Sequence, residues 1–436
     1  MSKHLVLSAF LMPGGYDQRA WRHAGSPAED LGKLSPLEVI AQKYEAAKLD
    51  SIFIADVISA SYILDGDVFM GNPYEPASAM GALASSTDRI GLIGTFSTTW
   101  NHPFTLARQL QALDVLSDGR AGWNIVTSSR AEENYGSVLP PKEERYRRAA
   151  EVVEAMRQLW AAWSDKAVIA DRESGNWVDP ALIRPIDFEG EFVKVQGFLN
   201  QRRSPQGHPV LAQAGQSPDG VRFGSAVADL IYTAQPSREH AIDFRMKYRE
   251  ALSSVGRNPD HVKITPGLVP YVAETETEAQ ELFRAMDRFT DFEAAKAKFT
   301  AEYRVDLSGL DLDEPIPLER FDTLDMTSSR GGTYREMTEG NGFTLRQILV
   351  NASSSSGHLV AVGTASQVAD TMIDWFESDA CDGFSLNAPL VPETVDSICE
   401  LLVPELRSRG YFREEYTGTT LRDHLGLPIP PAWDEQ

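Results

Sequence analysis

Eight short apolar runs recur along the chain, and most of them are separated by segments with the apolar periodicity of helices. The runs cover residues 5–11, 51–55, 90–95, 122–127, 209–214, 230–234, 264–272 and 383–387. This alternation of strand and helix predicts βαβ units and a parallel sheet. Eight repeats predict a closed (β/α)8 barrel (a TIM barrel) in the α/β class, with a doubly wound open sheet as the alternative.

Capping patterns support helices between the runs. Ser35 and Glu38 form a capping-box pattern with Pro36 at the first helical position, and Thr364 and Gln367 form a second one. A capping box satisfies backbone N–H groups at the first turn of a helix. Helices are therefore predicted to start after Ser35 and after Thr364.

Two segments interrupt the alternation, at about 165–208 and 274–361. The longer one lies between the seventh and eighth strands and is polar, with serine-rich stretches near Arg330 and at 353–357. Long insertions on a barrel are usually surface excursions or active-site lids. We expect the longer insertion to be a mobile cover over the site, with a plain solvent-exposed loop as the alternative.

Charge and cysteine content limit the partners and the compartment. The net charge of −22 disfavours nucleic acid and anionic membranes as partners, because like charges repel. Two cysteines do not form a disulfide framework, so a reducing cytoplasm is expected. We expect neither a secretory signal nor a membrane span, since no apolar run approaches about 20 residues.

Polar residues follow several of the predicted strands, where the chemistry of a parallel barrel lies. They include Asp56 after the second strand, Thr95 at the third and Asn124 at the fourth. After the fifth strand, residues 214–220 read A-G-Q-S-P-D-G, with Ser217 as a predicted N-cap. The N–H groups and positive dipole end of such a helix can bind a phosphate, although an ordinary capped helix is the alternative.

Other catalytic patterns are missing from the sequence. There is no G-x-S-x-G or H-E-x-x-H run, and the eight histidines show no metal-ligand spacing. We therefore expect no metal site. A strand-end site with a phosphate-binding helix indicates that an organic cofactor performs the chemistry.

Sequence blocks along nearly the whole chain then point to a family. They lie at 21–23, 48–50, 53–56, 94–99, 119–120, 123–128, 145–146, 203–207, 214–218, 382–386, 403–406, 409–416 and 420–427. With these blocks the chain resembles the flavin-dependent monooxygenases of the bacterial luciferase-like superfamily. It is most similar to the branch that contains the nitrilotriacetate, EDTA, dibenzothiophene-sulfone and long-chain alkane monooxygenases.

The resemblance implies a single luciferase-like TIM-barrel domain over 1–436 and a two-component reaction. A separate NAD(P)H:flavin reductase would supply reduced FMN, and O2 would add at flavin C4a. The resulting flavin peroxide or C4a-hydroperoxide would oxidise a small organic substrate, often beside nitrogen or sulfur, possibly with C–N or C–S cleavage. A homodimer or homotetramer is expected.

The resemblance also implies cofactor-binding residues. The family's strand-2 aspartate, strand-3 threonine, helix tyrosine and turn serine fall on Asp56, Thr95, Tyr146 and Ser217. Gly215 in the same turn and Asn124 at the fourth strand complete the expected set.

One position departs from the family pattern. Lys142 stands where relatives often carry a histidine, four residues before the tyrosine, and the preceding loop 129–141 is shorter than usual. A lysine can donate to a flavin phosphate or oxygen as a point charge. The alternative is a solvated loop lysine, and the role of the missing histidine in proton transfer stays open.

Three histidines are candidates for proton transfer. His358, after the serine-rich stretch, is the first choice, followed by His102 and His23. An apolar wall against the flavin or substrate is expected from Trp100, Trp123 and Phe10, which could also be core, with a mixed role favoured for Trp123. A flavin-degrading enzyme like riboflavin lyase and a non-enzymatic flavin-binding protein are the alternative functions.

Overall fold

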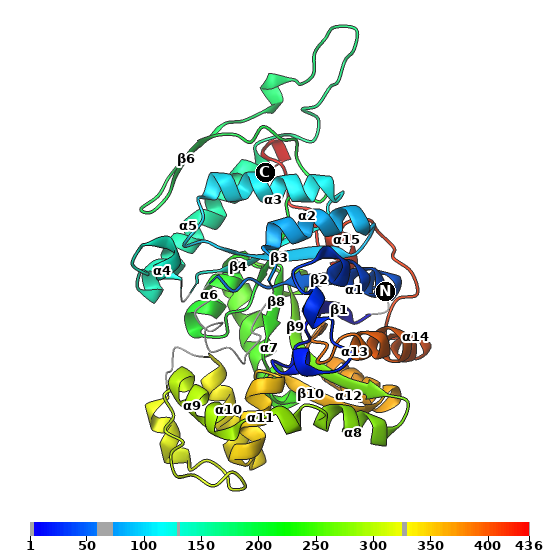
Figure 1. Ribbon diagram of the computed structural model, residues 1–436. Coiled ribbons are helices and arrows are strands. Elements are labelled where there is room, and N and C mark those ends of the chain that lie inside the picture. The colour runs from blue at the N-terminus through cyan, green and yellow to red at the C-terminus, as the bar shows by residue number, and fades with distance from the viewer. Residues whose placement is uncertain (1–3, 59–72, 129–130, 325–328, 436) are drawn as a thin grey trace.

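The chain closes into a barrel of eight parallel strands (Figure 1). The computed structural model describes residues 4–58, 73–128, 131–324 and 329–435. The strands are β1 Val6–Phe10, β2 Ser51–Ile54, β3 Gly91–Ser97, β4 Ala121–Val126, β7 Val210–Gln213, β8 Leu230–Thr233, β9 Lys263–Ala273 and β11 Gly383–Leu386. Because β9 pairs in parallel with both β11 and β8, the two ends of the strand order meet and the sheet has no break. All eight predicted strands are confirmed, and the open sheet is excluded.

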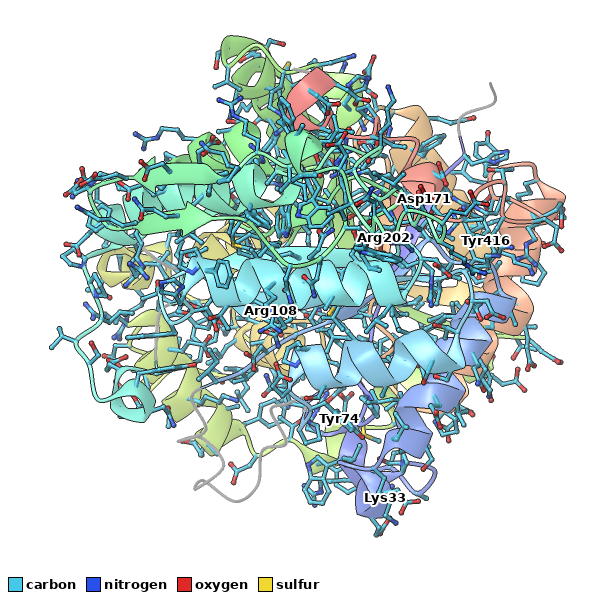
Figure 2. All side chains as sticks on the ribbon, turned by 90° about the horizontal axis from the view of Figure 1, so that it is seen from above. Lys33, Tyr74, Arg108, Asp171, Arg202 and Tyr416 are labelled. Carbon is cyan, nitrogen blue, oxygen red and sulfur yellow. The ribbon has the colours of Figure 1, made fainter. Side chains whose placement is uncertain are left out.

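Helices form the outer layer around the strands (Figure 1). They are α1 Leu34–Ala46, α2 Pro76–Ser86, α3 Pro103–Leu116, α5 Lys142–Ala161, α6 Pro218–Val227, α7 Arg238–Ser254, α12 Ala365–Glu377, α13 Glu393–Ser397 and α14 Val403–Ser408. Figure 2 shows Arg108 on the outer side of α3, and Leu106 and Leu110 of that helix are fully buried. The strands are thus covered on their outer face and read as nearly continuous apolar runs.

One predicted helix start is confirmed and one is wrong. Thr364 and Gln367 form a complete capping box at the start of α12. The helix α1 already includes Ser35, and its N-cap is Lys33, whose side chain makes no capping hydrogen bond. Capping patterns therefore located the first helix to within two residues without identifying its cap.

The longer insertion is a helical unit rather than an irregular loop. It contains α8 Glu276–Arg284, α9 Phe292–Tyr303, α10 Ser329–Asn341 and α11 Leu345–Ser354. Its own apolar core is formed by side chains including Phe299, Tyr303, Phe321, Tyr334, Leu345 and Ile348. The alternative of a plain solvent-exposed loop is therefore excluded, and the expected role as a mobile cover over the site stays a prediction.

A further strand lies at the end of this insertion. Residues Leu359–Thr364 form strand β10, which pairs in parallel with the outer half of β9 from Leu268 to Ala273. The strand β9 therefore leaves the barrel and carries a short extension of the sheet beside the insertion. The shorter insertion contains the antiparallel strands β5 Ile186–Glu189 and β6 Lys194–Gly197, and it projects away from the barrel (Figure 1).

A short helix near the C-terminus closes the amino end of the barrel. Leu421 and Leu425 of α15, Leu421–Leu425, pack with Val6 and Ile93 inside the barrel. A Cβ atom at Gly91 would lie 2.4 Å from the Leu421 side chain, so only glycine leaves room for this packing. Open positions are thus confined to the carboxyl ends of the strands, called the barrel mouth below.

Candidate functional site

Side chains from neighbouring strands meet inside the barrel mouth and form an aromatic half and a polar half. Phe10, Phe53 and Tyr232 form the aromatic half, with ring centroids 5.3 Å apart for the first pair and 5.9 Å for the pairs with Tyr232. In the polar half, the Asn124 amide nitrogen donates to the Thr95 hydroxyl at 3.0 Å. Both residues were predicted as site residues, and the structure brings them together.

The Asn124 side chain has unused hydrogen-bonding capacity. It is buried, and its Oδ1 atom has no hydrogen-bond partner among the described residues. A buried polar atom without a partner costs about 1–3 kcal/mol, so such groups usually face a ligand or water. Asn124 is therefore suited to hold a polar edge of a ligand.

Asp56 lies on the rim beyond β2 and has a perturbed acidity. Burial raises the pKa of its carboxyl group to about 6, and the nearby Glu75 carboxylate adds to the increase. Tyr135 lies near enough that the Asp56 charge contributes to a raised tyrosine pKa, mainly caused by burial. The ring of Tyr135 stacks on Trp100 at 4.7 Å. Asp56 is thus a carboxyl group that changes charge close to neutral pH.

Two helix N-termini meet on the opposite rim. Ser217 is the N-cap of α6, with Pro218 at the first helical position, and its hydroxyl accepts a hydrogen bond from the Gly220 N–H at 3.3 Å. Lys142 is the first residue of α5, and its Nζ atom lies 3.3 Å from the Ser217 hydroxyl. The positive ends of two helix dipoles and one ammonium group therefore converge on one point.

Tyr146 and Gly215 complete this anion site. Tyr146 lies one turn after Lys142. Burial raises the pKa of its hydroxyl group, and a hydrogen bond with Ser217 offsets part of the increase. A Cβ atom at Gly215 would lie 2.8 Å from the Gly220 Cα atom, so glycine allows the turn to pass over the first turn of α6. The four predicted residues Lys142, Tyr146, Gly215 and Ser217 are all brought together here.

Lys142 is not a solvated loop residue. Its side chain is about one-third exposed and also lies 3.7 Å from the Asp219 carboxylate. Asp219 is half-exposed in the first turn of α6, where a bound anion would compete with it for the lysine. Lys142 therefore stands beside the anion site as a point charge.

His358 lies in the aromatic half of the mouth. It is 2% exposed, and its Nε2 atom is 2.8 Å from the Tyr232 hydroxyl oxygen. That oxygen also accepts a hydrogen bond from the Asn387 amide nitrogen at 3.4 Å. The imidazole packs on Gly267 of β9, where a Cβ atom would lie 2.4 Å from Nδ1. His358 is thus the predicted histidine that reaches the inside of the barrel.

The other two candidate histidines lie elsewhere. His102 is the exposed N-cap of α3, and its Nδ1 atom accepts a hydrogen bond from the Phe104 N–H at 3.3 Å. His23 lies 3.3 Å from the Glu393 carboxylate, beside Arg284 of α8 in a surface depression. The structure does not bring either of them to His358, and their catalytic roles stay predictions.

Two aromatic predictions have different outcomes. Phe10 lines the mouth as expected. Trp123 is fully buried on the outer face of β4, where its indole N–H donates to the Phe96 carbonyl oxygen and its ring packs against Trp160. The expected mixed role of Trp123 is therefore wrong, and it is a core residue.

Sequence reasoning missed Tyr232, Gly267 and Asn387. Tyr232 and Asn387 lie near or just after the carboxyl ends of β8 and β11, so the strand-end rule that selected Thr95 and Asn124 also applied to them. Gly267 lies in the middle of the long strand β9, where that rule does not apply. Their segments read as ordinary buried strands, and only the contact with His358 distinguishes them.

The described residues also bear on membrane-spanning and metal-dependent functions. No helix in this part of the chain is long and apolar enough to cross a membrane. Across residues 4–58, 73–128, 131–324 and 329–435, no cluster of three or more His, Cys, Asp or Glu side chains could hold a metal ion. The described residues form a rim where two helix N-termini meet at Lys142 and Ser217, together with the polar half and the aromatic half of the mouth.

Comparison with known proteins gives matches along the whole chain. The family model for luciferase-like monooxygenases matches residues 14–381. The N-acetyl-S-(2-succino)cysteine monooxygenase of Bacillus subtilis (strain 168) is 37% identical over 433 residues, 98% of each chain. Nitrilotriacetate monooxygenase component A of Aminobacter aminovorans is 34% identical, again over 98% of each chain. A crystal structure of a riboflavin lyase with modified FMN and riboflavin superposes with a TM-score of 0.86 at 28% identity, covering 100% of this chain and 98% of that one.

Proposed function

The chain belongs to the luciferase-like monooxygenase family and is a flavin-dependent monooxygenase, and from this premise we propose its cofactor, partner and substrate class. It takes reduced FMN from a separate NAD(P)H:flavin reductase and uses dioxygen to oxidise a small organic substrate. One oxygen atom enters the substrate and the other leaves as water, with reduced FMN supplying two electrons. A reaction divided between two protein components agrees with the name of the nitrilotriacetate relative, which is called component A.

The residues of the mouth fit FMN. The meeting of the α5 and α6 N-termini at Lys142 and Ser217 suits the phosphate of FMN, and this single observation carries the assignment. The unpartnered Asn124 Oδ1 atom suits a polar edge of the ring system. Asp56 follows β2 and Thr95 lies on the neighbouring strand β3, and both are proposed to donate to the flavin or accept from it. Reduced flavin, when bound, supplies the electrons that activate dioxygen.

The protein's own groups bind, orient and protect. Lys142, Tyr146 and Ser217 hold the phosphate, which fixes the position of the flavin ring over the strand ends. The aromatic half, with Phe10 and Phe53, excludes water from the place where oxygen is transferred. His358 manages protons beside that place, since it is the predicted histidine inside the mouth.

We propose a substrate that contains sulfur or nitrogen beside the oxidised carbon, with cleavage of a C–S or C–N bond. The names of the two relatives support this class, since one acts on an S-substituted cysteine and the other on an amine with carboxylate arms. The oxygen atom would enter as a hydroxyl group on the carbon beside the heteroatom. The bond between that carbon and the heteroatom would then break and the hydroxyl proton would pass to the leaving group, so that a thiol, sulfinic acid or amine leaves and a carbonyl compound remains.

The test supplies reduced FMN enzymatically from a purified flavin reductase and offers a panel of thioethers, sulfones and tertiary amines under isotopically labelled dioxygen. We expect product that carries one labelled oxygen atom, with flavin recovered intact. If no member of the panel becomes labelled while reduced FMN binds tightly, the substrate class is wrong. If reduced FMN does not bind, the cofactor assignment is wrong.

Flavin cleavage is the second candidate, and the structural similarity to a riboflavin lyase favours it. In that case the flavin would be the substrate as well as the cofactor. Chromatography after many turnovers distinguishes the two, because a lyase converts riboflavin or FMN into ring and side-chain fragments.

We further propose that the protein works in the cytoplasm as a homodimer or homotetramer. The absence of a disulfide framework in the sequence supports the compartment, with Cys381 and Cys399 as free thiols. Burial raises the pKa of Cys399 to about 12, so its thiol is unreactive near neutral pH. Analytical ultracentrifugation would establish the assembly.

A further inference from the structure

We propose that the Tyr232 hydroxyl group is the proton-exchanging group at the barrel mouth, and that His358 acts through it. Asn387 is a positioning residue for the same pair. This inference rests on the proposed oxygenase function, because it names the residue that moves protons beside the reacting atoms.

His358 and Tyr232 differ in their exposure. His358 is 2% exposed, whereas Tyr232 is only partly buried and lies on β8 with its ring against Phe10 and Phe53. The Nε2 atom of the imidazole lies 2.8 Å from the hydroxyl oxygen. A group at the mouth therefore meets the tyrosine hydroxyl before it meets the histidine.

The Tyr232 hydroxyl oxygen accepts a hydrogen bond from Asn387. The Asn387 amide nitrogen can only donate, so the Tyr232 oxygen accepts this bond. We assign the hydroxyl proton of Tyr232 to its contact with Nε2 of His358. A neutral His358 whose Nε2 accepts this hydrogen bond carries its own proton on Nδ1. The proposal thus predicts one tautomer.

The imidazole of His358 is sterically confined. Cβ at Gly267 would lie 2.4 Å from Nδ1 and 2.8 Å from Cε1, so the ring rests directly on the backbone of β9. On another side the Tyr16 ring approaches at 5.9 Å in an edge arrangement. Held by backbone and rings, His358 keeps its Nε2 atom aimed at Tyr232.

The resulting step is a two-proton relay. A proton from the site binds to the Tyr232 oxygen while the hydroxyl proton moves to Nε2, which leaves neutral tyrosine and a protonated imidazole. The reverse movement returns a proton to the site. A histidine that stays buried can in this way exchange protons at the mouth, and the tyrosine never carries a full charge in either end state.

The test is nuclear magnetic resonance of the protein with 15N-labelled histidine, without flavin, at a pH where the imidazole is neutral. His358→Gln identifies the signals of His358. We expect the Nδ1–H tautomer in the wild-type protein and a shift toward the Nε2–H tautomer in Tyr232→Phe, which keeps the ring but removes the hydroxyl group. Tyr16→Phe is the matched control, because it removes the hydroxyl group of another ring that packs beside the same histidine, and the tautomer should not change.

An Nε2–H tautomer in the wild type, or the same tautomer in wild type and Tyr232→Phe, would overturn the proposal. Since no flavin is present, this result is independent of whether the oxygenase assignment holds. Once a substrate is known, Tyr232→Phe should lower turnover about a hundredfold, and adding His358→Gln to it should lower turnover little further. Additive losses would also contradict a relay.

Discussion

The two ends of the barrel contain the same kinds of side chain and use them differently. At the closed amino end, the Arg422 guanidinium lies 3.0 Å from the Asp229 carboxylate, and both groups are buried. Burial and the nearby Arg422 charge lower the pKa of His208 to about 3, so that histidine stays neutral. At the mouth, by contrast, Asn124 Oδ1 lacks a partner among the described residues, and the charge that acts on the Asp56 carboxyl group is the like charge of Glu75.

The difference between the ends is the kind of partner that each ionisable group has. At the closed end, Asp50 accepts from the Leu7 N–H at 2.7 Å and pairs with Arg413. Partners of this kind hold the two ends of the chain together. At the mouth, burial shifts the pKa of Asp56, and Asn124 Oδ1 is still available to a ligand, as a binding site requires.

The largest expected effect breaks the closed end. Arg422→Ala should lower the free energy of unfolding by about 3–5 kcal/mol, because it leaves the Asp229 carboxylate buried without its closest cation. Chemical denaturation measures the change. Arg108→Ala on the exposed side of α3 is the control and should change stability by less than about 0.5 kcal/mol. A stable Arg422→Ala protein would mean that the closed end is not held by this pair.

The next effect separates binding from folding at the mouth. Ser217→Ala should weaken the binding of reduced FMN about ten- to a hundredfold, since it removes a hydroxyl group at the proposed phosphate site. It should also cost about 1 kcal/mol of stability through the lost N-cap. Thr344→Ala removes the N-cap of α11 and should cost similar stability without changing flavin affinity. Equal flavin affinity in both variants would place the phosphate elsewhere.

A steric substitution tests the aromatic half. Gly267→Ala should destabilise the protein by about 1–3 kcal/mol, because the added Cβ atom would lie 2.4 Å from the His358 ring. Thermal unfolding measures the effect. Gly340→Ala in α10 is the control, since its Cβ would meet nothing within 4 Å, and it should raise stability slightly. If both variants behave alike, His358 does not rest on β9 as described.

The smallest effect is a pH dependence at Asp56. Its pKa is raised to about 6 in the folded protein, so its stabilising contribution is present at low pH and is lost as pH rises toward 6. Relative to Asp56→Asn, the wild type should lose about 1 kcal/mol between roughly pH 4 and pH 7, a value reduced for the partial exposure of the carboxyl group. Parallel stability curves for the two proteins would contradict the raised pKa.

The sequence predicted the barrel and the rim because both depend on local patterns. Apolar runs locate buried strands, and the strand-end rule together with a Ser-Pro helix start selected Thr95, Asn124 and Ser217. Lys142 could be placed beside Ser217 only by the structure, since the contact joins residues 75 positions apart.

Parts that depend on long-range packing were not predicted. The helical insertion has its own core, and its apolar residues were too sparse in a polar segment to be recognised. Trp123 reads as either wall or core until the direction of β4 is known, because a one-residue shift moves a side chain to the other face. The Tyr232 contact with His358 joins residues 126 positions apart, which no local pattern encodes.

The most direct test of the account is a pair of anaerobic titrations with reduced FMN and with reduced riboflavin. If the two helix N-termini at the mouth bind the phosphate, reduced FMN binds at least about tenfold more tightly, and Lys142→Met removes most of that difference. Equal affinity for the two flavins in the wild-type protein would contradict the central claim that the open end of the barrel is built around a phosphate.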